Sequence, residues 1–224
     1  MNLKLVFSLL MQFTLLILML FIPAGTLNWP AGWAMVAALG LFTVAVAMMS
    51  ARTNSGLLEE RTRLQHHNQK RWDRVFGVVS GMITFSWLLV MPLDAVRFKW
   101  SMMPLTLQIM GLVGLVIALT IIYLTFRENA YLSTVVRIQD ERGQKVISTG
   151  PYHYIRHPMY TGIGIMFISA ALLLGSWLGF MFAIILVILY AIRSIFEERT
   201  LQEELAGYTE YAASVRYRLI PHIW

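Results

Sequence analysis

The chain has 224 residues, of which 58% are hydrophobic and 13% are charged. Soluble domains carry about 25% charged residues, so this composition indicates a membrane protein. The length suits five or six spans of about 20 residues each and leaves no room for a separate soluble catalytic domain. The net charge of +6 fits basic loops beside apolar spans rather than nucleic-acid binding. The lack of cysteine excludes disulfides, thiolate metal sites and a cysteine nucleophile.

Apolar segments occupy most of the chain. The first is longer than the 7 to 15 residues of the apolar core of a signal peptide, so we expect it to be retained as a span. Gly111 and Gly114 lie in the fourth segment, where small residues allow neighbouring helices to pack closely. The first four segments cover about 3–22, 31–50, 75–92 and 104–125.

A final apolar stretch, 158–192, is too long for one straight helix across a bilayer of about 30 Å, at about 1.5 Å per residue. Gly175, Ser176 and Trp177 divide it, so we expect a helical hairpin. Beyond Arg193 the tail is polar and helical in pattern.

Basic residues gather in the stretches 51–74 and 126–157 and in the tail after 193. These regions share one side if six segments cross, and the bias of Lys and Arg towards the cytoplasm places that side and both termini there. The sequence therefore predicts an all-α, polytopic membrane helix bundle of five to six spans. We expect N-terminal spans over 1–103 and a catalytic core over 104–224, within one structural domain.

The segment 148–162 is dense in polar aromatic and cationic side chains, yet it leads directly into an apolar helix. Pro158 suits the first turn of that helix, where a missing N–H costs nothing. The free N–H groups there, with Arg156 and His157 beside them, predict an anion-binding pocket. An interfacial anchor of aromatic and basic residues is the alternative, and both interpretations stay open.

A second pattern pairs Arg193 with Glu197, which lie four residues apart on one helix face. A surface ion pair would contribute only a few tenths of a kcal/mol. Ionisable residues at the end of a span, however, often serve a function, so this pair has two open interpretations. We interpret His66 and His67 as part of a solvated loop, and Glu59 and Glu60 as a solvated face. No metal site is expected.

Together the two patterns resemble the isoprenylcysteine carboxyl methyltransferase family, whose broader group contains the phospholipid N-methyltransferases. The resemblance covers about 105–224, and the first hundred residues match it only in being membrane spans. The residues that carry it are Gly150, Pro151, Tyr152, Tyr154, Arg156, His157, Pro158, Tyr160 and Gly162, followed by Arg193, Glu197, Glu198, Tyr208, Tyr211 and Pro221.

The resemblance implies a cytoplasmic pocket for S-adenosylmethionine. Arg193 would bind the methyl acceptor and, with Arg156, serve the transfer. The implied cofactor contacts are Gln139, Lys145, Val146, Ile147, Tyr152, His157, Pro158, Met159, Tyr160 and Glu197.

A carboxylate acceptor is already ionised at neutral pH and needs no base, only a cation such as Arg193 to place it. An amine acceptor must first lose a proton. We therefore expect a carboxyl methyltransferase acting on an isoprenylcysteine-like, prenylated or other lipophilic acceptor among the membrane lipids. The alternatives are a phospholipid N-methyltransferase, a sterol reductase with a nicotinamide cofactor, and a scaffold or transporter that binds no cofactor.

Overall fold

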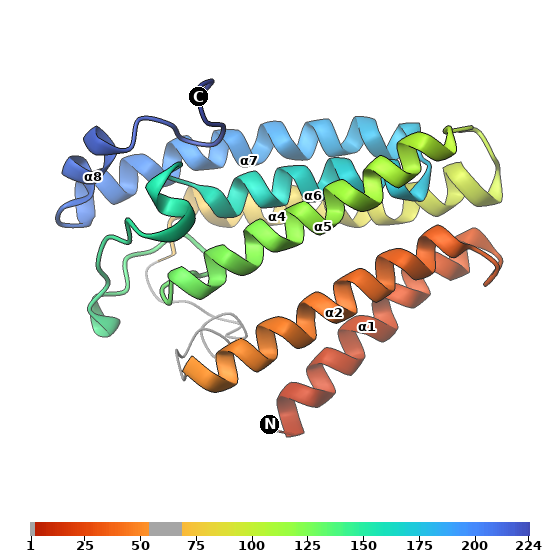
Figure 1. Cartoon of the computed structure of the whole chain (residues 1–224), viewed down its shortest axis with the longest axis horizontal. Coiled ribbons are helices and arrows are strands. Elements are labelled where there is room, and N and C mark those ends of the chain that lie inside the picture. The colour runs from red at the N-terminus through yellow and green to blue at the C-terminus, as the bar shows by residue number, and fades with distance from the viewer. Residues whose placement is uncertain (1–2, 54–68) are drawn as a thin grey trace.

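The computed structural model describes residues 3–53 and 69–224, and within these ranges it contains helices and no strands (Figure 1). The predicted all-α class is therefore confirmed. Glu59, Glu60, His66 and His67 lie outside the described residues. The longer helices are α1 (Leu3–Ala24), α2 (Pro30–Thr53), α4 (Arg71–Pro92), α5 (Leu105–Glu128), α6 (Pro158–Leu174) and α7 (Trp177–Glu204). The shorter elements are η1 (Leu93–Arg97), η2 (Asp140–Arg142), η3 (Gly150–His153) and α8 (Tyr208–Ser214).

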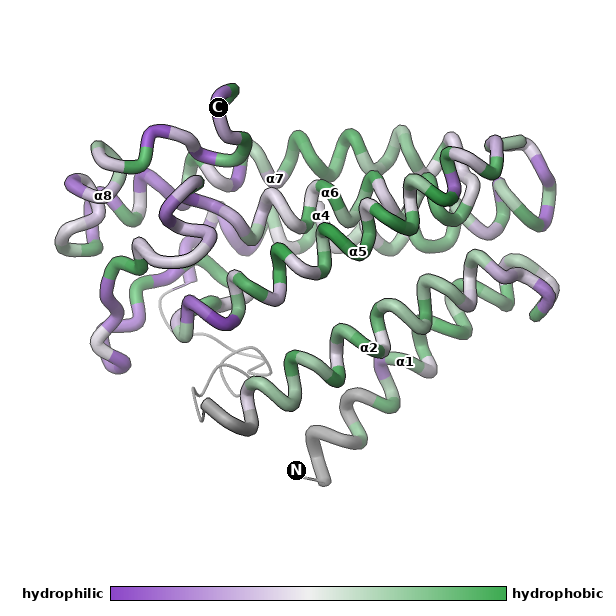
Figure 2. Tube along the Cα trace, in the orientation of Figure 1, coloured by the Kyte–Doolittle hydropathy of each residue, from purple (hydrophilic) through white to green (hydrophobic). Residues whose placement is uncertain are grey.

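Four helical stretches are long and apolar enough to cross a membrane: Pro30–Ser50, Arg71–Arg97, Leu105–Glu128 and Trp177–Glu204. Leu10–Ala24 and Pro158–Leu174 are shorter apolar helices. Figure 2 shows hydrophobic residues along these helices and hydrophilic ones gathered towards one end of the bundle. The chain is an integral membrane helix bundle, and the predicted five to six spans require one or both of the shorter helices to cross as well.

The predicted hairpin is present between α6 and α7. Gly175 ends α6 with a φ of 81°, a left-handed conformation that glycine adopts without steric cost. Ser176 then caps α7, because its side chain accepts a hydrogen bond from the backbone N–H of Gly179 at 2.8 Å. Helix α7 continues past the apolar stretch to Glu204, so Arg193 and Glu197 belong to the same rigid rod as the span.

Helices α5 and α6 pack with their backbones close together, as Gly111 and Gly114 predicted. A Cβ at Gly111 would overlap the backbone of Leu173, and one at Gly114 would overlap the side chain of Ser169. From the α6 side, a Cβ at Gly162 would lie 2.6 Å from Cγ1 of Ile122. These three glycines fix the separation of the two helices.

A buried carboxylate joins η1 to the α6–α7 hairpin. Asp94 accepts hydrogen bonds from the hydroxyls of Ser101 and Ser176, both at 2.6 Å, and from the backbone N–H of Leu178 at 3.2 Å. The side chain of Asp94 has no exposed surface. A carboxylate beside the first N–H groups of α7 also stabilises that helix end, so this charge holds the end of the bundle opposite the polar one.

The polar end brings together segments that are far apart in the sequence. The start of α4, the segment 129–157, the end of α7, α8 and the C-terminal tail all lie there (Figure 1). The backbone of the tail binds the start of α6: the N–H groups of Arg156 and His157 donate to the carbonyls of Tyr217 and Arg218, at 3.0 and 2.9 Å. The candidate site lies in this polar end.

Candidate functional site

A cavity of about 120 Å³ lies between the segment 129–147, the start of α6, the end of α7 and α8. Most of the site residues predicted from the sequence line this one cavity, although they come from four separate segments. Pro158 does not, and it lines a neighbouring groove instead. The nominated residues in the cavity wall are Gln139, Lys145, Val146, Ile147, Tyr152, Arg156, His157, Met159, Tyr160, Arg193 and Glu197.

Gln139 organises the segment 129–147. Its side-chain N–H donates to the carbonyl of Tyr131, and its side-chain oxygen accepts from Arg142 Nη1 at 2.6 Å. Its backbone N–H donates to the side chain of Gln144 at 2.8 Å. With its side chain 1% exposed and hydrogen-bonded at both ends, Gln139 shapes the cavity wall from within the loop.

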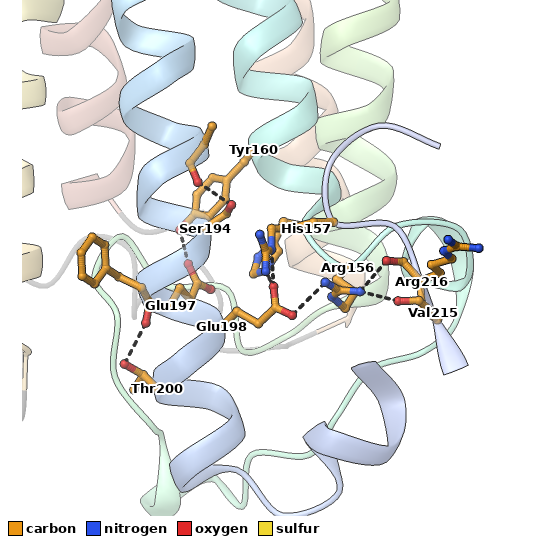
Figure 3. Close-up of polar contacts among 12 residues, drawn as sticks. Arg156, His157, Tyr160, Ser194, Glu197, Glu198, Thr200, Val215 and Arg216 are labelled. Carbon is orange, nitrogen blue, oxygen red and sulfur yellow. Dashed lines mark hydrogen bonds and ion pairs between the residues drawn. The ribbon is translucent and has the colours of Figure 1, made fainter. Parts of the chain in front are cut away.

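Glu198 occupies the place where the sequence predicted an anion. Its carboxylate lies 2.8 Å from Arg156 Nη2 and 3.7 Å from His157 Nε2, and it accepts a hydrogen bond from Arg218 Nε. Figure 3 shows Arg156 between this carboxylate and the carbonyls of Val215 and Arg216, to which Nη1 donates at 2.6 and 2.8 Å. The anion bound beside Arg156 and His157 is therefore the protein's own.

These contacts give Arg156 a structural task. Its guanidinium joins the start of α6 to α7 through Glu198 and to the C-terminal tail through two carbonyls. The predicted participation of Arg156 in methyl transfer therefore stays a prediction, and its contacts favour positioning over contact with a reacting atom.

Arg193 is buried and paired with a residue of another helix. Its Nη2 lies 2.8 Å from Asp73 Oδ1 and donates to the carbonyl of Thr134 at 2.9 Å. The guanidinium also lies over the ring of Phe76, 4.8 Å from its centroid, and 5.7 Å from that of Tyr160. Such ring faces attract cations. Of the two interpretations left open for Arg193 and Glu197, the surface ion pair does not apply, because Arg193 is buried and its ion pair is with Asp73.

Glu197 instead accepts a hydrogen bond from the hydroxyl of Tyr160 on α6 (Figure 3). The ring of Tyr160 stacks on that of His157, with centroids 5.6 Å apart and planes inclined by 12°. Glu197 and Glu198, although adjacent in sequence, thus have different partners. Glu197 faces the cavity, and Glu198 binds Arg156 and Arg218 beside it.

Three tyrosines close the cavity on the side of α8. Tyr152 accepts from Asn129 Nδ2 at 2.8 Å, and the hydroxyl of Tyr211 donates to the carbonyl of Tyr152 at 2.8 Å. The hydroxyl of Tyr208 is buried and has no hydrogen-bond partner within residues 3–53 and 69–224. Burial raises the pKa of Tyr208, Tyr152 and Tyr211 well above the ordinary value for tyrosine, so all three keep their protons at neutral pH.

A second, larger hollow lies on the other side of Tyr160. This groove has a volume of about 940 Å³ and is lined mainly by apolar side chains of α5, α6 and α7, with Gly164 in its wall. Leu219, Ile220 and Pro221 of the C-terminal tail line it too, as do the polar residues Arg127 and His153. Tyr160 lines both the cavity and the groove.

The cavity residues fit the groups of S-adenosylmethionine. Tyr208 Oη and Arg193 Nε are buried donors without a hydrogen-bond partner in the described part of the chain, and leaving them so costs about 1–3 kcal/mol each. A carboxylate or hydroxyl on a ligand would satisfy them. The aliphatic side chains of Val146 and Ile147 and the ring of Tyr152 offer an apolar surface for an adenine.

The sequence did not assign a role to Asp73, Glu198 or Tyr208. Asp73 stands in a stretch rich in charged residues, where nothing distinguishes a buried carboxylate from a solvated one. Glu198 and Tyr208 are part of the family pattern, so that pattern was the available signal for them. Within residues 3–53 and 69–224, no cluster of His, Asp and Glu suits a metal ion.

Residues 106–206 match the model of the phospholipid methyltransferase family. The match begins in α5 and ends just after α7, so it includes the segment 129–157, Arg193 and Glu197. A search of curated proteins found no match. Asp73 on α4 and Tyr208 on α8 lie outside the matched residues.

Proposed function

From the match of residues 106–206 to the phospholipid methyltransferase family, we propose that the protein transfers a methyl group from S-adenosylmethionine to a lipophilic acceptor at the cytoplasmic face of the membrane. The observation that carries the proposal is the position of Tyr160 between a polar cavity and an apolar groove. A methyl transfer between a water-soluble donor and a lipid needs two such compartments that meet at one point.

S-adenosylmethionine supplies an electrophilic methyl group on a sulfonium, and displacement requires the acceptor atom in line with that bond. The protein contributes positioning, which can supply a large part of a rate enhancement. Tyr208 and His157 are donors for the carboxylate or hydroxyl groups of the cofactor. The carboxylate of Glu197 suits its ammonium or a hydroxyl.

The acceptor's chain lies in the groove. Hydrocarbon gains about 25 cal/mol per Å² when it leaves water for an apolar surface, but a lipid already in the bilayer gains little from the transfer itself. The groove therefore selects by shape, and we expect a chain to enter it from the bilayer between the helices that line it. Arg127 and His153 suit an anionic or polar head group.

For the acceptor atom, the first candidate is a carboxylate of the isoprenylcysteine type. It rests on Arg193, whose Nε donor faces no hydrogen-bond partner among the described residues. The second candidate is the amine of a phospholipid. It rests on the family match and on Asp73, which offsets the charge that would otherwise repel an ammonium.

A labelling experiment tests the proposal. Purified protein receives methyl-labelled S-adenosylmethionine with a prenylcysteine analogue or with phosphatidylethanolamine, and lipid-bound label is counted before and after alkali. Label released as methanol identifies a methyl ester, whereas stable label identifies N-methylation. No lipid-bound label with either acceptor, in protein that binds the cofactor, would remove both candidate acceptors.

Cofactor binding is measured separately by calorimetry. His157→Ala and Glu197→Ala should each weaken it by about tenfold, the loss of one charge-assisted hydrogen bond. Glu203→Ala, an exposed position on the same helix, serves as the matched control and should bind as the unchanged protein does. Unchanged affinity in both cavity variants would contradict the assignment of this cavity to the cofactor.

A further inference from the structure

Asp73 lies outside the part of the chain that matches the family, yet it supports the cavity from behind. Its side chain is 1% exposed. Besides its ion pair with Arg193, it accepts a hydrogen bond at 2.9 Å from the backbone N–H of Val136 and one at 3.0 Å from Gln69 Nε2. Arg193 and Val136 both line the cavity, whereas Asp73 does not. One carboxylate thus holds two of its walls.

The ion pair also has an electrostatic consequence. Arg193 is 8% exposed, so water screens its charge poorly. S-adenosylmethionine carries a carboxylate, an ammonium and a sulfonium, which leaves one positive charge in excess. A guanidinium without its ion-pair partner would repel this ligand in the same low-dielectric cavity.

We propose that Asp73 is the counter-ion of the methyl-transfer site: its contact with Arg193 neutralises the guanidinium so that the cavity accepts a cationic methyl donor. The inference rests on the proposed function. Asp73 is then a positioning residue that acts through Arg193. Helix α4, which the family match does not include, would thus help to determine the charge of the ligand that the cavity binds.

A counter-ion at Asp73 should affect the binding of the methyl donor and of its demethylated product differently. The demethylated product, S-adenosylhomocysteine, has the same carboxylate, ammonium and adenine but lacks the sulfonium, so it carries no net charge. A purely structural role for Asp73 affects both ligands equally, because they share every other group. A counter-ion role affects the donor more than the product.

Calorimetry on the full chain in detergent measures the affinities of both ligands. Asp73→Asn keeps an oxygen for the N–H of Val136 and removes the charge. We expect its affinity for S-adenosylmethionine to fall about tenfold more than its affinity for S-adenosylhomocysteine. Asp73→Glu should restore the ratio. The double variant Asp73→Asn/Arg193→Gln, which is neutral again, should return the ratio to its original value.

The chain offers a matched control at the same junction of α4 and α7. Lys70 and Glu204 form an ion pair whose side chains are 33% and 40% exposed. Solvent screens such a pair, so Glu204→Gln, the same change of charge, should leave the ratio of the two affinities unchanged.

Equal losses for both ligands in Asp73→Asn would overturn the proposal and leave Asp73 a structural residue. If that variant does not fold, Arg193→Gln decides the matter, because its excess negative charge should shift the ratio in the opposite direction, towards the donor. An unshifted ratio in Arg193→Gln would overturn it as well. Absence of binding of either ligand by the unchanged protein would instead contradict the proposed function.

Discussion

The hydroxyl of Tyr160 donates a hydrogen bond to the carboxylate of Glu197. Tyr160 lies between the polar cavity and the apolar groove, since it lines both. Tyr160 is on α6 and Glu197 is on α7, so the contact also joins the two helices of the hairpin. It fixes the ring that both ligands would touch in the proposed reaction.

Replacement of Tyr160 should distinguish the ring from its hydroxyl. Tyr160→Phe keeps the partition and removes a hydrogen bond to a charged group, so we expect a loss of about 1.5–3 kcal/mol in the free energy of unfolding with methyl transfer retained. Tyr160→Ala removes the partition itself and should abolish transfer. Thermal unfolding and the labelling assay measure the two effects. Full transfer by the alanine variant would contradict the separation of the compartments by this ring.

Tyr208 offers a test of ligand binding that is independent of folding. Its buried hydroxyl has no hydrogen-bond partner in the described ranges, so Tyr208→Phe should leave the stability of the ligand-free protein unchanged or raise it. Affinity for S-adenosylmethionine should fall by about three- to tenfold. Because burial raises the pKa of Tyr208, the hydroxyl keeps its proton, and this contribution should stay constant from neutral pH to about pH 10.

Tyr211→Phe is the matched control for Tyr208. The hydroxyl of Tyr211 donates to the carbonyl of Tyr152, so its loss should lower the free energy of unfolding by about 1 kcal/mol. The two phenylalanine variants should thus show opposite patterns of stability and affinity. If Tyr208→Phe is the less stable of the two and binds normally, its hydroxyl does not serve a ligand.

Glu198→Gln tests the ion pairs of Glu198 with Arg156 and Arg218, which hold the C-terminal tail. The change leaves Arg156 and Arg218 without their shared anion in a buried site, which typically costs about 3–5 kcal/mol. We expect a lower unfolding temperature and faster proteolysis within the tail. Glu203→Gln, exposed on the same helix, should change neither. Equal resistance to protease in both variants would argue against this role for Glu198.

Gly164 tests the groove. A Cβ there would meet Val187 at an ordinary 3.5 Å, so a larger side chain can be accommodated by the backbone but projects into space that the acceptor's chain needs. Gly164→Val should raise the KM for the acceptor by about tenfold, equivalent to about 1.4 kcal/mol, and leave cofactor affinity unchanged. Gly81→Val, where a Cβ would meet no atom within 4 Å, is the control. A KM that rises equally in both variants would count against the groove.

The all-α class and the hairpin could be predicted because membrane helices are set by local sequence. Apolar length fixes each span, and Gly175 with Ser176 marks the turn. Close packing of α5 against a neighbour followed in the same way from Gly111 and Gly114, but the identity of α6 as that neighbour did not. Arg193 was different: its nearest candidate partner in sequence is Glu197, but its actual partner, Asp73, is 120 positions away. Local periodicity carries no information on such a contact.

The site residues that could be foreseen are those of the family pattern, since the pattern brings distant segments together without reference to geometry. It did not separate the tasks of neighbouring residues. Glu197 and Glu198 are identical in type and adjacent in sequence, yet one faces the cavity and the other holds Arg156 and Arg218. The rotation of α7 about its axis decides which of the two glutamates faces the cavity. That rotation is set by packing across the bundle.

The glycine contacts between α5 and α6 also limit how the protein can move. Gly111 lies against the backbone of Leu173, and Gly114 and Gly162 lie against the side chains of Ser169 and Ile122. The two helices therefore cannot slide or separate without losing these close contacts. A bulky acceptor can therefore widen the groove by displacing α7 or the C-terminal tail, which also lines it. Because Arg193 sits on α7 and is tied to Asp73 on α4, a displacement of α7 pulls directly on that ion pair. In the proposed reaction, a lipid that displaced α7 would therefore act on the same ion pair that faces the cofactor cavity, and α7 would couple the two substrates.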